Sequence, residues 1–84
     1  MYLVTISIQL FARAREEAGV PTLQLDVPTG TTVSQMRGRL AKLYPQLQAI
    51  LKVSCLAVNS EIADETRIIE VTDEVALLPP VSGG

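Results

Sequence analysis

The sequence predicts an α+β roll in which one main helix packs on one face of a mixed β-sheet. Residues 2–10 and 22–27 alternate between apolar and polar side chains, as strands buried on one face do. Between residues 32 and 47, apolar side chains recur at helical spacing. An apolar segment at residues 74–78 predicts a last strand. We expect residues 1–84 to form one domain, because a chain of 84 residues can bury only a modest core.

The first strand is expected at residues 2–10, followed by a short helix and a second strand that pairs with the first. The side chains predicted to face inward on the first strand are Tyr2, Val4, Ile6, Ile8 and Leu10. Residues 11–19 are good helix formers, and Gly19 stands where helices often end. Arg15 on this helix is expected to be solvated, and the alternative is a contact with a partner.

The main helix is predicted to begin at Thr32 and to end near Tyr44. Thr32 and Gln35 have the spacing of a capping box, and Pro45 disfavours the helical conformation in its predecessor. A further helical turn is expected at residues 46–52. The apolar stripe of the helix consists of Val33, Met36, Leu40, Leu43, Tyr44 and Leu47.

Short strands are predicted in the second half of the chain, at residues 54–59 and 61–63, with a turn at Asn59 and Ser60. Cys55 lies in an apolar run without a neighbouring base, so we expect a small buried side chain and not a nucleophile. The segment 64–73 has no clear pattern, and Ile68 and Ile69 are expected to anchor it.

The last strand, at residues 74–78, is expected to present Val75 and Leu77 to the core. Its alternation then places Ala76 and Leu78 on the other face of the sheet. An outward Leu78 is either an ordinary surface leucine or the start of a surface that binds a partner.

Composition excludes several classes of function. The chain has no histidine, which removes the commonest general base and metal ligand, and a single cysteine forms neither an intrachain disulfide nor a paired-cysteine zinc site. It has no basic run and few aromatic residues, so nucleic-acid binding is not expected. No apolar run approaches the roughly 20 residues of a membrane span, and no signal peptide is recognisable. We therefore expect a cytoplasmic protein without a metal site or a tightly bound cofactor.

The C-terminal segment 79–84 is expected to be a flexible tail. Pro79 and Pro80 end the strand and favour an extended backbone after it, whereas Gly83 and Gly84 could enter a narrow slot. The alternative is an ordinary frayed terminus. The terminal carboxylate is ionised at neutral pH and resists acyl attack, so another protein would have to activate it. Adenylation would supply a leaving group, and sulfur could then replace one oxygen to give a thiocarboxylate.

Three stretches resemble one family. Residues 73–84, DEVALLPPVSGG, closely resemble the ending of the small subunit of molybdopterin synthase, the MoaD family. Residues 10–19, LFARAREEAG, look like that family's first-helix motif, and Ala57-Val58-Asn59 also matches. A terminal Gly-Gly alone is shared by all ubiquitin-like modifiers and sulfur carriers. The chain departs from the family at residues 71–75, where the usual Gly before Asp-Glu-Val is missing, so the turn there is expected to differ.

The resemblance implies a ubiquitin-like β-grasp fold and a carrier that is not an enzyme by itself. Gly84 would be adenylated with ATP by a MoeB-like enzyme, converted to a thiocarboxylate with a sulfurtransferase, and inserted into a MoaE-like large subunit. There it would give sulfur to cyclic pyranopterin monophosphate, with the catalytic residues on the large subunit and two copies of each subunit in the complex. The implied partner-binding residues are Gly83, Ser82, Val81, Pro80, Pro79, Leu78, Leu77, Phe11 and Arg15.

The sequence also leaves other functions open. A ubiquitin-like sulfur carrier could serve thiamine synthesis or tRNA thiolation instead. The chain could also be a protein modifier joined to lysines through Gly84, or an interaction module with an inert tail.

Overall fold

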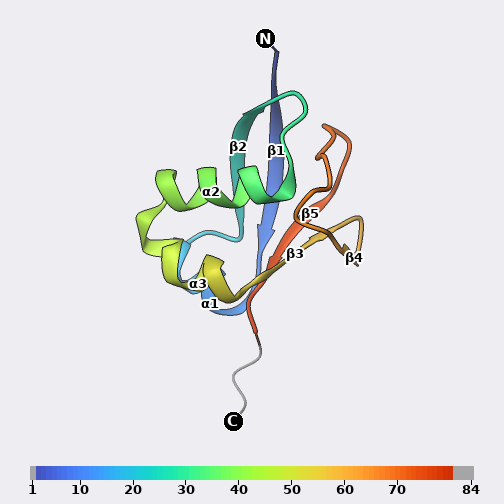
Figure 1. Cartoon of the computed structure of the whole chain (residues 1–84). Helices are drawn as coiled ribbons and strands as arrows, with labels where there is room; N and C mark the ends of the chain where they lie inside the picture. The colour runs from blue at the N-terminus through green and yellow to red at the C-terminus, as the bar shows by residue number, and fades with distance from the viewer. Residues whose placement is uncertain (1, 81–84) are drawn as a thin grey trace.

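The chain folds as one mixed sheet with helices on one of its faces (Figure 1). The structure, a computed structural model, describes residues 2–80. The strand order is β2-β1-β5-β3-β4; β1 pairs with β5 in parallel, and the other pairs are antiparallel. The elements are β1 (Leu3–Leu10), α1 (Ala12–Ala18), β2 (Thr22–Pro28), α2 (Val33–Leu43), the 3-10 turn η1 (Pro45–Leu47), α3 (Gln48–Val53), β3 (Cys55–Val58), β4 (Glu61–Ile62) and β5 (Val75–Leu78).

The antiparallel pair of β1 and β2 confirms the predicted alternation. Ile6 pairs with Leu25 and Ile8 with Leu23, and all four side chains are buried under the helices. Tyr2 was predicted to face inward, and this is wrong. It precedes β1, whose pairing with β2 begins only at the next residue, and its side chain is 83% exposed.

The helix α1 ends as the sequence predicts. Gly19 adopts φ of +76°, and its N–H donates a hydrogen bond of 2.9 Å to the Arg15 carbonyl oxygen. This left-handed conformation is open to glycine at little cost. The chain then turns directly into β2, which starts three residues later.

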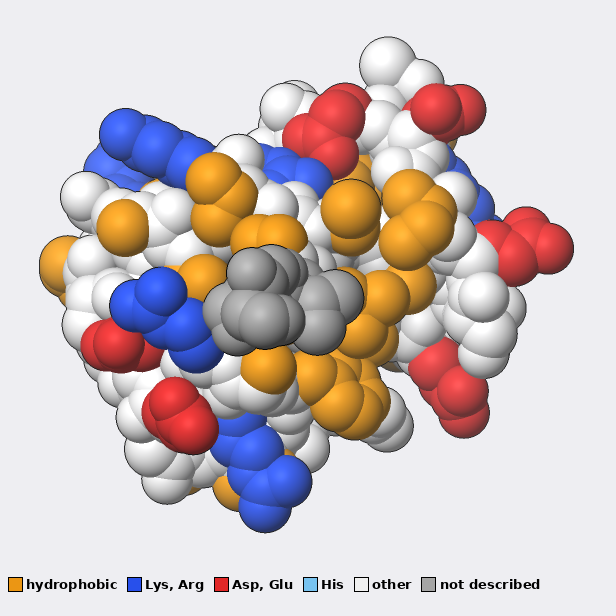
Figure 2. Space-filling model, turned by 90° about the horizontal axis from the view of Figure 1, so that it is seen from below, with side chains coloured by type: hydrophobic (Ala, Val, Ile, Leu, Met, Phe, Trp, Pro, Cys, Tyr) orange, Lys and Arg blue, Asp and Glu red, His pale blue; other side chains and the backbone are white. Residues whose placement is uncertain are grey.

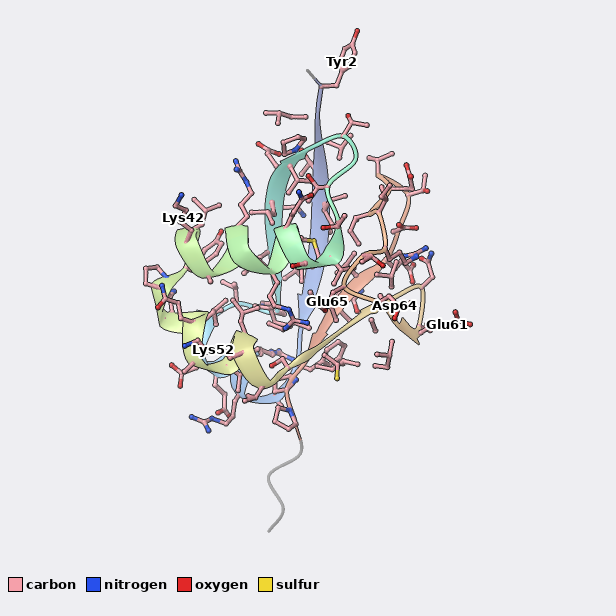
Figure 3. The ribbon with its side chains drawn as sticks, viewed as in Figure 1. Tyr2, Lys42, Lys52, Glu61, Asp64 and Glu65 are labelled. Carbon is pink, nitrogen blue, oxygen red and sulfur yellow. The ribbon has the colours of Figure 1, made fainter. Side chains whose placement is uncertain are left out.

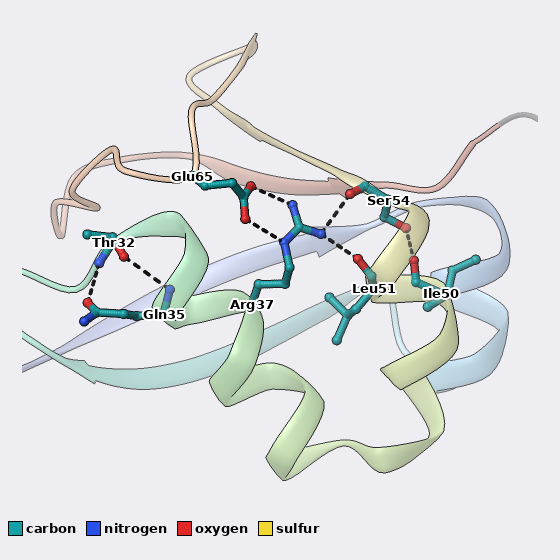
Figure 4. A network of polar contacts seen from close by, with 7 residues as sticks. All are labelled: Thr32, Gln35, Arg37, Ile50, Leu51, Ser54 and Glu65. Atoms are coloured by element: carbon teal, nitrogen blue, oxygen red, sulfur yellow. Dashed lines mark hydrogen bonds and ion pairs between the residues drawn. The ribbon is translucent and has the colours of Figure 1, made fainter.

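The capping box of α2 is present. The Thr32 hydroxyl accepts a hydrogen bond of 3.2 Å from the Gln35 N–H, and the Gln35 side chain accepts one of 2.9 Å from the Thr32 N–H (Figure 4). The helix buries Met36 and Leu40 completely, but Leu43, predicted in the stripe, is exposed. Leu43 is the last residue of α2. The turn η1 fills the core in its place with the fully buried side chain of Leu47, which the stripe also predicts to face inward.

The hairpin of β3 and β4 turns at Asn59 and Ser60, as predicted. Both residues have positive φ, 53° and 69°, which is the geometry of a tight two-residue hairpin turn. Cys55 was predicted to be buried, and this is wrong: it is exposed. Leu56 is buried, so alternation along β3 turns Cys55 to the face away from the helices.

The segment between β4 and β5 is held at one of its two predicted anchors. Ile69 is buried, and its N–H donates a hydrogen bond of 2.9 Å to the Thr31 carbonyl oxygen. Ile68 was also predicted as an anchor but is half exposed. Ile68 forms an isolated β-bridge with Thr32 beside the start of α2. Successive side chains of an extended segment alternate in direction, so Ile68 points away from the core while Ile69 points into it.

Candidate partner-binding site

The strand β5 occupies the middle of the sheet and carries the C-terminal segment. It lies between β1, where Leu10 pairs with Leu77, and β3, where Cys55 pairs with Leu78. The strand has paired neighbours on both sides up to Leu77, and its last residue, Leu78, is paired on the β3 side. Pro79 comes next and is half buried, and Pro80 is exposed. The sheet therefore defines the place from which the chain leaves the domain.

Leu77 faces the core, as the alternation along the last strand predicted. Its side chain is fully buried, at 0% exposure, within the core cluster under the helices. The sequence placed it inward by alternation, and the resemblance placed it at an interface. The structure confirms the first expectation, and the implied place of Leu77 at an interface stays a prediction.

Leu78 and Phe11 are brought together on the outer face of the sheet, the face away from the helices. Phe11 comes directly after β1 and is 45% exposed, and it lines one shallow hollow together with Leu78. This is a result of the parallel pairing of β1 and β5, which makes both strands end on the same side of the molecule (Figure 1). Two residues separated by most of the chain thus form one surface.

Further apolar side chains continue this surface across β5, β3 and β4. The pairs Ala76–Ala57 and Ala57–Ile62 lie side by side, and Cys55 lies opposite Leu78. Figure 2 shows hydrophobic side chains gathered on the end of the molecule where β5 finishes. We call this surface the apolar patch and define it by Phe11, Cys55, Ala57, Ile62, Ala76 and Leu78.

Beyond Leu3 and Pro28, the outer face of β1 and β2 carries mainly polar side chains, and two pairs of them are hydrogen bonded across the strands. The Thr5 hydroxyl donates to the Asp26 carboxylate at 2.6 Å, and the Gln24 amide donates to the Ser7 hydroxyl at 2.8 Å. These polar side chains therefore bind one another across β1 and β2. The apolar half lies beside the end of β5, where a partner that receives the C-terminal segment would have to approach.

Arg15 is not brought to the apolar patch. It is exposed on α1 and lines a separate hollow with Ala12, Glu16 and Gly19. The structure leaves its role as a partner contact untested. The remaining predicted site residues, Val81, Ser82, Gly83 and Gly84, lie outside the described residues, so their predicted roles stay predictions.

A hydrogen-bonded turn fixes the start of β5, and sequence reasoning missed it. Asp73 accepts a hydrogen bond of 2.8 Å from the Glu70 N–H and one of 2.9 Å from the Asn59 amide. The Asn59 side chain accepts one of 3.0 Å from the Glu74 N–H. The Glu70 N–H, the Asn59 amide and the charge of Arg67 hold the pKa of Asp73 below its usual range. The turn closes without glycine.

Arg37 is a second residue that sequence reasoning missed, because it lies off the apolar stripe of α2 like an ordinary solvated charge. Its guanidinium forms two hydrogen bonds with the Glu65 carboxylate, at 2.9 and 3.1 Å (Figure 4). It also donates to the carbonyl oxygens of Leu51 and Ser54 at the end of α3. The hydrogen bonds of Arg37 with the Glu65 carboxylate, together with the charge of Arg37, lower the pKa of Glu65. The group joins α2, α3 and the segment before β5.

The part of the chain that the structure describes offers neither a metal-binding cluster nor a membrane-spanning helix. Between residues 2 and 80 there is no group of three or more acidic, cysteine or histidine side chains that could hold a metal ion. Within the same residues, no helix combines the length and the apolar character that crossing a bilayer requires.

Comparison with known proteins decides the family. The model of the ThiS family matches residues 8–84. The chain belongs to the ThiS family. Among the relatives of this ThiS-family chain is the "Molybdopterin synthase sulfur carrier subunit" of Arabidopsis thaliana, 41% identical over 81 residues, which are 96% of this chain and 84% of the relative. The resemblance that the sequence suggested is thereby confirmed.

Solved structures confirm the ubiquitin-like β-grasp fold of this ThiS-family member. The crystal structure of SAMP1 from Haloferax volcanii has a TM-score of 0.82 and 31% identity, covering 95% of this chain and 99% of that one. A complex of subunits 1 and 2 of the molybdopterin-converting factor from Helicobacter pylori has a chain with a TM-score of 0.66 and 23% identity, covering 96% and 100%. At 23% identity, the similarity to the Helicobacter pylori chain shows a shared fold and no more.

Proposed function

We propose that this chain is the sulfur carrier subunit of molybdopterin synthase. The observation that carries the proposal is the 41% identity with a sulfur carrier subunit of that synthase along 96% of the chain. The position of the apolar patch beside the end of β5 supports it, since a carrier must dock while its C-terminus reaches a partner's active site. The large subunit of the synthase is the proposed partner, in a complex with two copies of each subunit.

The chemistry is assigned to the carboxyl group of Gly84. In the first step this carboxylate attacks ATP on a MoeB-like activating enzyme, pyrophosphate leaves, and an acyl-adenylate forms. A sulfur nucleophile supplied with a sulfurtransferase then displaces AMP, and sulfur takes the place of one carboxylate oxygen. The thiocarboxylate donates its sulfur to cyclic pyranopterin monophosphate, and the molybdopterin dithiolene needs two such transfers. ATP is consumed by the activating enzyme, and we assign the carrier to the cytoplasm.

The domain itself contributes position and recognition. The strand β5 holds the C-terminal segment, and the apolar patch provides the docking surface. The proposal places the residues that catalyse sulfur transfer on the large subunit.

The intact mass of the full chain tests the proposal. After incubation with the activating enzyme, ATP and a sulfur donor, we expect the mass change of one oxygen replaced by one sulfur, located in the C-terminal peptide. The chain lacking Gly84 should fold and bind the large subunit but should not support molybdopterin synthesis. Undiminished synthesis by the truncated chain would overturn the proposal.

A protein modifier is the second candidate, and one observation favours it. The small archaeal modifier protein SAMP1 of Haloferax volcanii is similar over 95% of this chain, at 31% identity. A modifier would form an isopeptide bond between Gly84 and a lysine of another protein. Peptide mapping of proteins that co-purify with the chain should then find lysines carrying its C-terminal residues. Co-purification with a thiamine or tRNA thiolation enzyme would instead indicate another sulfur pathway.

A further inference from the structure

We propose that the apolar patch contains a socket for one bulky apolar side chain of the partner, flanked in the partner by a lysine or arginine. Ala57 and Ala76 form the floor of the socket, and Phe11, Ile62 and Leu78 form its rim. The inference rests on the proposed function, because it takes the large subunit of molybdopterin synthase as the partner.

The socket arises from two alanines set between larger side chains. Ala76 and Ala57 are paired across β5 and β3, and Ile62 pairs with Ala57 from β4. The alanine side chains end at Cβ, whereas those of the rim extend well beyond it. The resulting hollow has a volume of about 260 Å³. A flat floor with raised sides accepts a side chain that projects from a facing surface.

The exposure of the rim shows why an occupant is favoured. Ile62 is 65% exposed and Phe11 is 45% exposed, although Ala57 between them is 6% exposed. A side chain that enters the hollow removes the exposed rim from water. Apolar anchors that fill such pockets at the centre of an interface contribute most of its affinity. On the polar half of the same face, Thr5 is hydrogen bonded to Asp26 and Ser7 to Gln24.

One acidic side chain of the socket indicates what accompanies the anchor. Glu74 lines the hollow. Glu61 and Asp64 (Figure 3) line a separate hollow together with Arg67. Glu61 pairs with the inward-facing Val58, so its side chain points to the opposite face from Ile62. Among the described residues that line the hollow, none is basic. Opposite charges across an interface fix its register and exclude wrong partners. A partner with a lysine or arginine beside its apolar anchor therefore fits this edge.

A larger side chain at position 76 tests the inference directly. Leucine in place of Ala76 would fill the socket while remaining on the outer face, where there is room for it. We expect Ala76→Leu to weaken binding to the large subunit roughly 30-fold, the loss typical of a central anchor. Ser7→Leu is the matched control, because it adds the same side chain to the polar half of the face. Calorimetric titration of each full-length variant with the large subunit gives the affinities, and thermal unfolding reports whether each variant is folded.

A second measurement needs no substitution. In the wild-type chain labelled at its alanine methyl groups, the large subunit should shift the resonances of Ala57 and Ala76 and leave that of Ala41 on α2 unchanged. Unshifted Ala57 and Ala76 methyls in a formed complex, or an Ala76→Leu affinity within twofold of the wild type, would overturn the socket while leaving the proposed function intact. No association of the wild type with the large subunit would overturn the proposed function and the socket with it.

Discussion

Asp73 is the residue on which the local geometry at the start of β5 depends most. Its carboxylate joins Glu70, Asn59 and Arg67, which come from two separate parts of the chain, and its side chain is only 7% exposed. Asn59 in turn binds the Glu74 backbone through both its N–H and its side-chain oxygen. One carboxylate therefore sets how the turn before β5 meets the β3–β4 hairpin.

Asp73 should make the stability of the domain depend on pH. Its pKa is lowered in the folded state from an ordinary value of 3.8, so its contribution is fully present above that value and is lost as the pH falls through the lower folded pKa. We expect Asp73→Asn to lower the free energy of unfolding at pH 7 and to differ less from the wild type as the pH falls below about 4. Urea unfolding of both proteins across this range measures the difference. A difference that stays constant with pH would contradict the role of the charge.

Arg37 should contribute more to stability than its place off the apolar stripe suggests. Its side chain is 22% exposed and donates to a carboxylate and to two carbonyl oxygens. Arg37→Met keeps the aliphatic stem and removes these donors, so we expect a loss of about 1–3 kcal/mol in the free energy of unfolding. Arg39→Met, at an exposed position of the same helix, is the control and should stay within about 0.5 kcal/mol of the wild type. Equal losses in the two variants would mean that the contacts of Arg37 contribute nothing specific.

At the scale of the elements, the N-terminus of α2 is the clearest case of local sequence setting local structure. The capping box satisfies two backbone donors where the helix leaves the loop after β2. Thr32→Ala removes the hydroxyl acceptor and should lower the free energy of unfolding by about 1 kcal/mol. Ser34→Ala, two residues later and exposed, should leave the free energy of unfolding unchanged or raise it slightly, because alanine is the better helix former. Chemical denaturation of both variants makes the comparison.

Elements with a strong local pattern could be predicted from the sequence, and elements defined by their neighbours could not. The alternation of β1 and β2, the capping box at Thr32 and the glycine at the end of α1 each have a local physical cause. The strand β3 is short and continuously apolar, so nothing local decides which of its sides is inner. Its pairing with β5 decides this, and the prediction for Cys55 failed for that reason.

The candidate site shows the same division. Alternation along β5 predicted an outward Leu78 and an inward Leu77, and the structure confirms both directions. The neighbours of Leu78 could not be predicted, because Phe11 reaches it only through the parallel pairing of β1 with β5. The contacts of Arg37 with Glu65 also join residues far apart in sequence, and charge spacing along α2 carries no sign of them.

At the scale of the whole molecule, the sheet separates two tasks between its faces. The inner face and the helices build the core, and the outer face is free of helices (Figure 1). The apolar part of that outer face lies where β5 ends, so a partner bound there would receive the C-terminal segment. With the proposed docking surface, stability and recognition depend on alternate residues of one strand. Substitutions at neighbouring positions of β5 should therefore differ in their effect: one should impair folding, and the next should impair binding to the partner.

Leu78→Asp and Leu77→Asp test this separation. Leu78 is half buried on the outer face, so its replacement by aspartate should leave the domain folded and weaken association with the large subunit by a few kcal/mol, the cost of burying an unpaired charge. Leu77 is fully buried in the core, so the same change there should prevent stable folding. Thermal unfolding and calorimetric titration distinguish the two effects, with Ser7→Asp on the polar half of the face as the control, because a carboxylate there can still accept the hydrogen bond of the Gln24 amide. If Leu78→Asp binds the large subunit as tightly as the control does, the apolar patch is not the docking surface, because the charge at residue 78 would then remain in water in the complex.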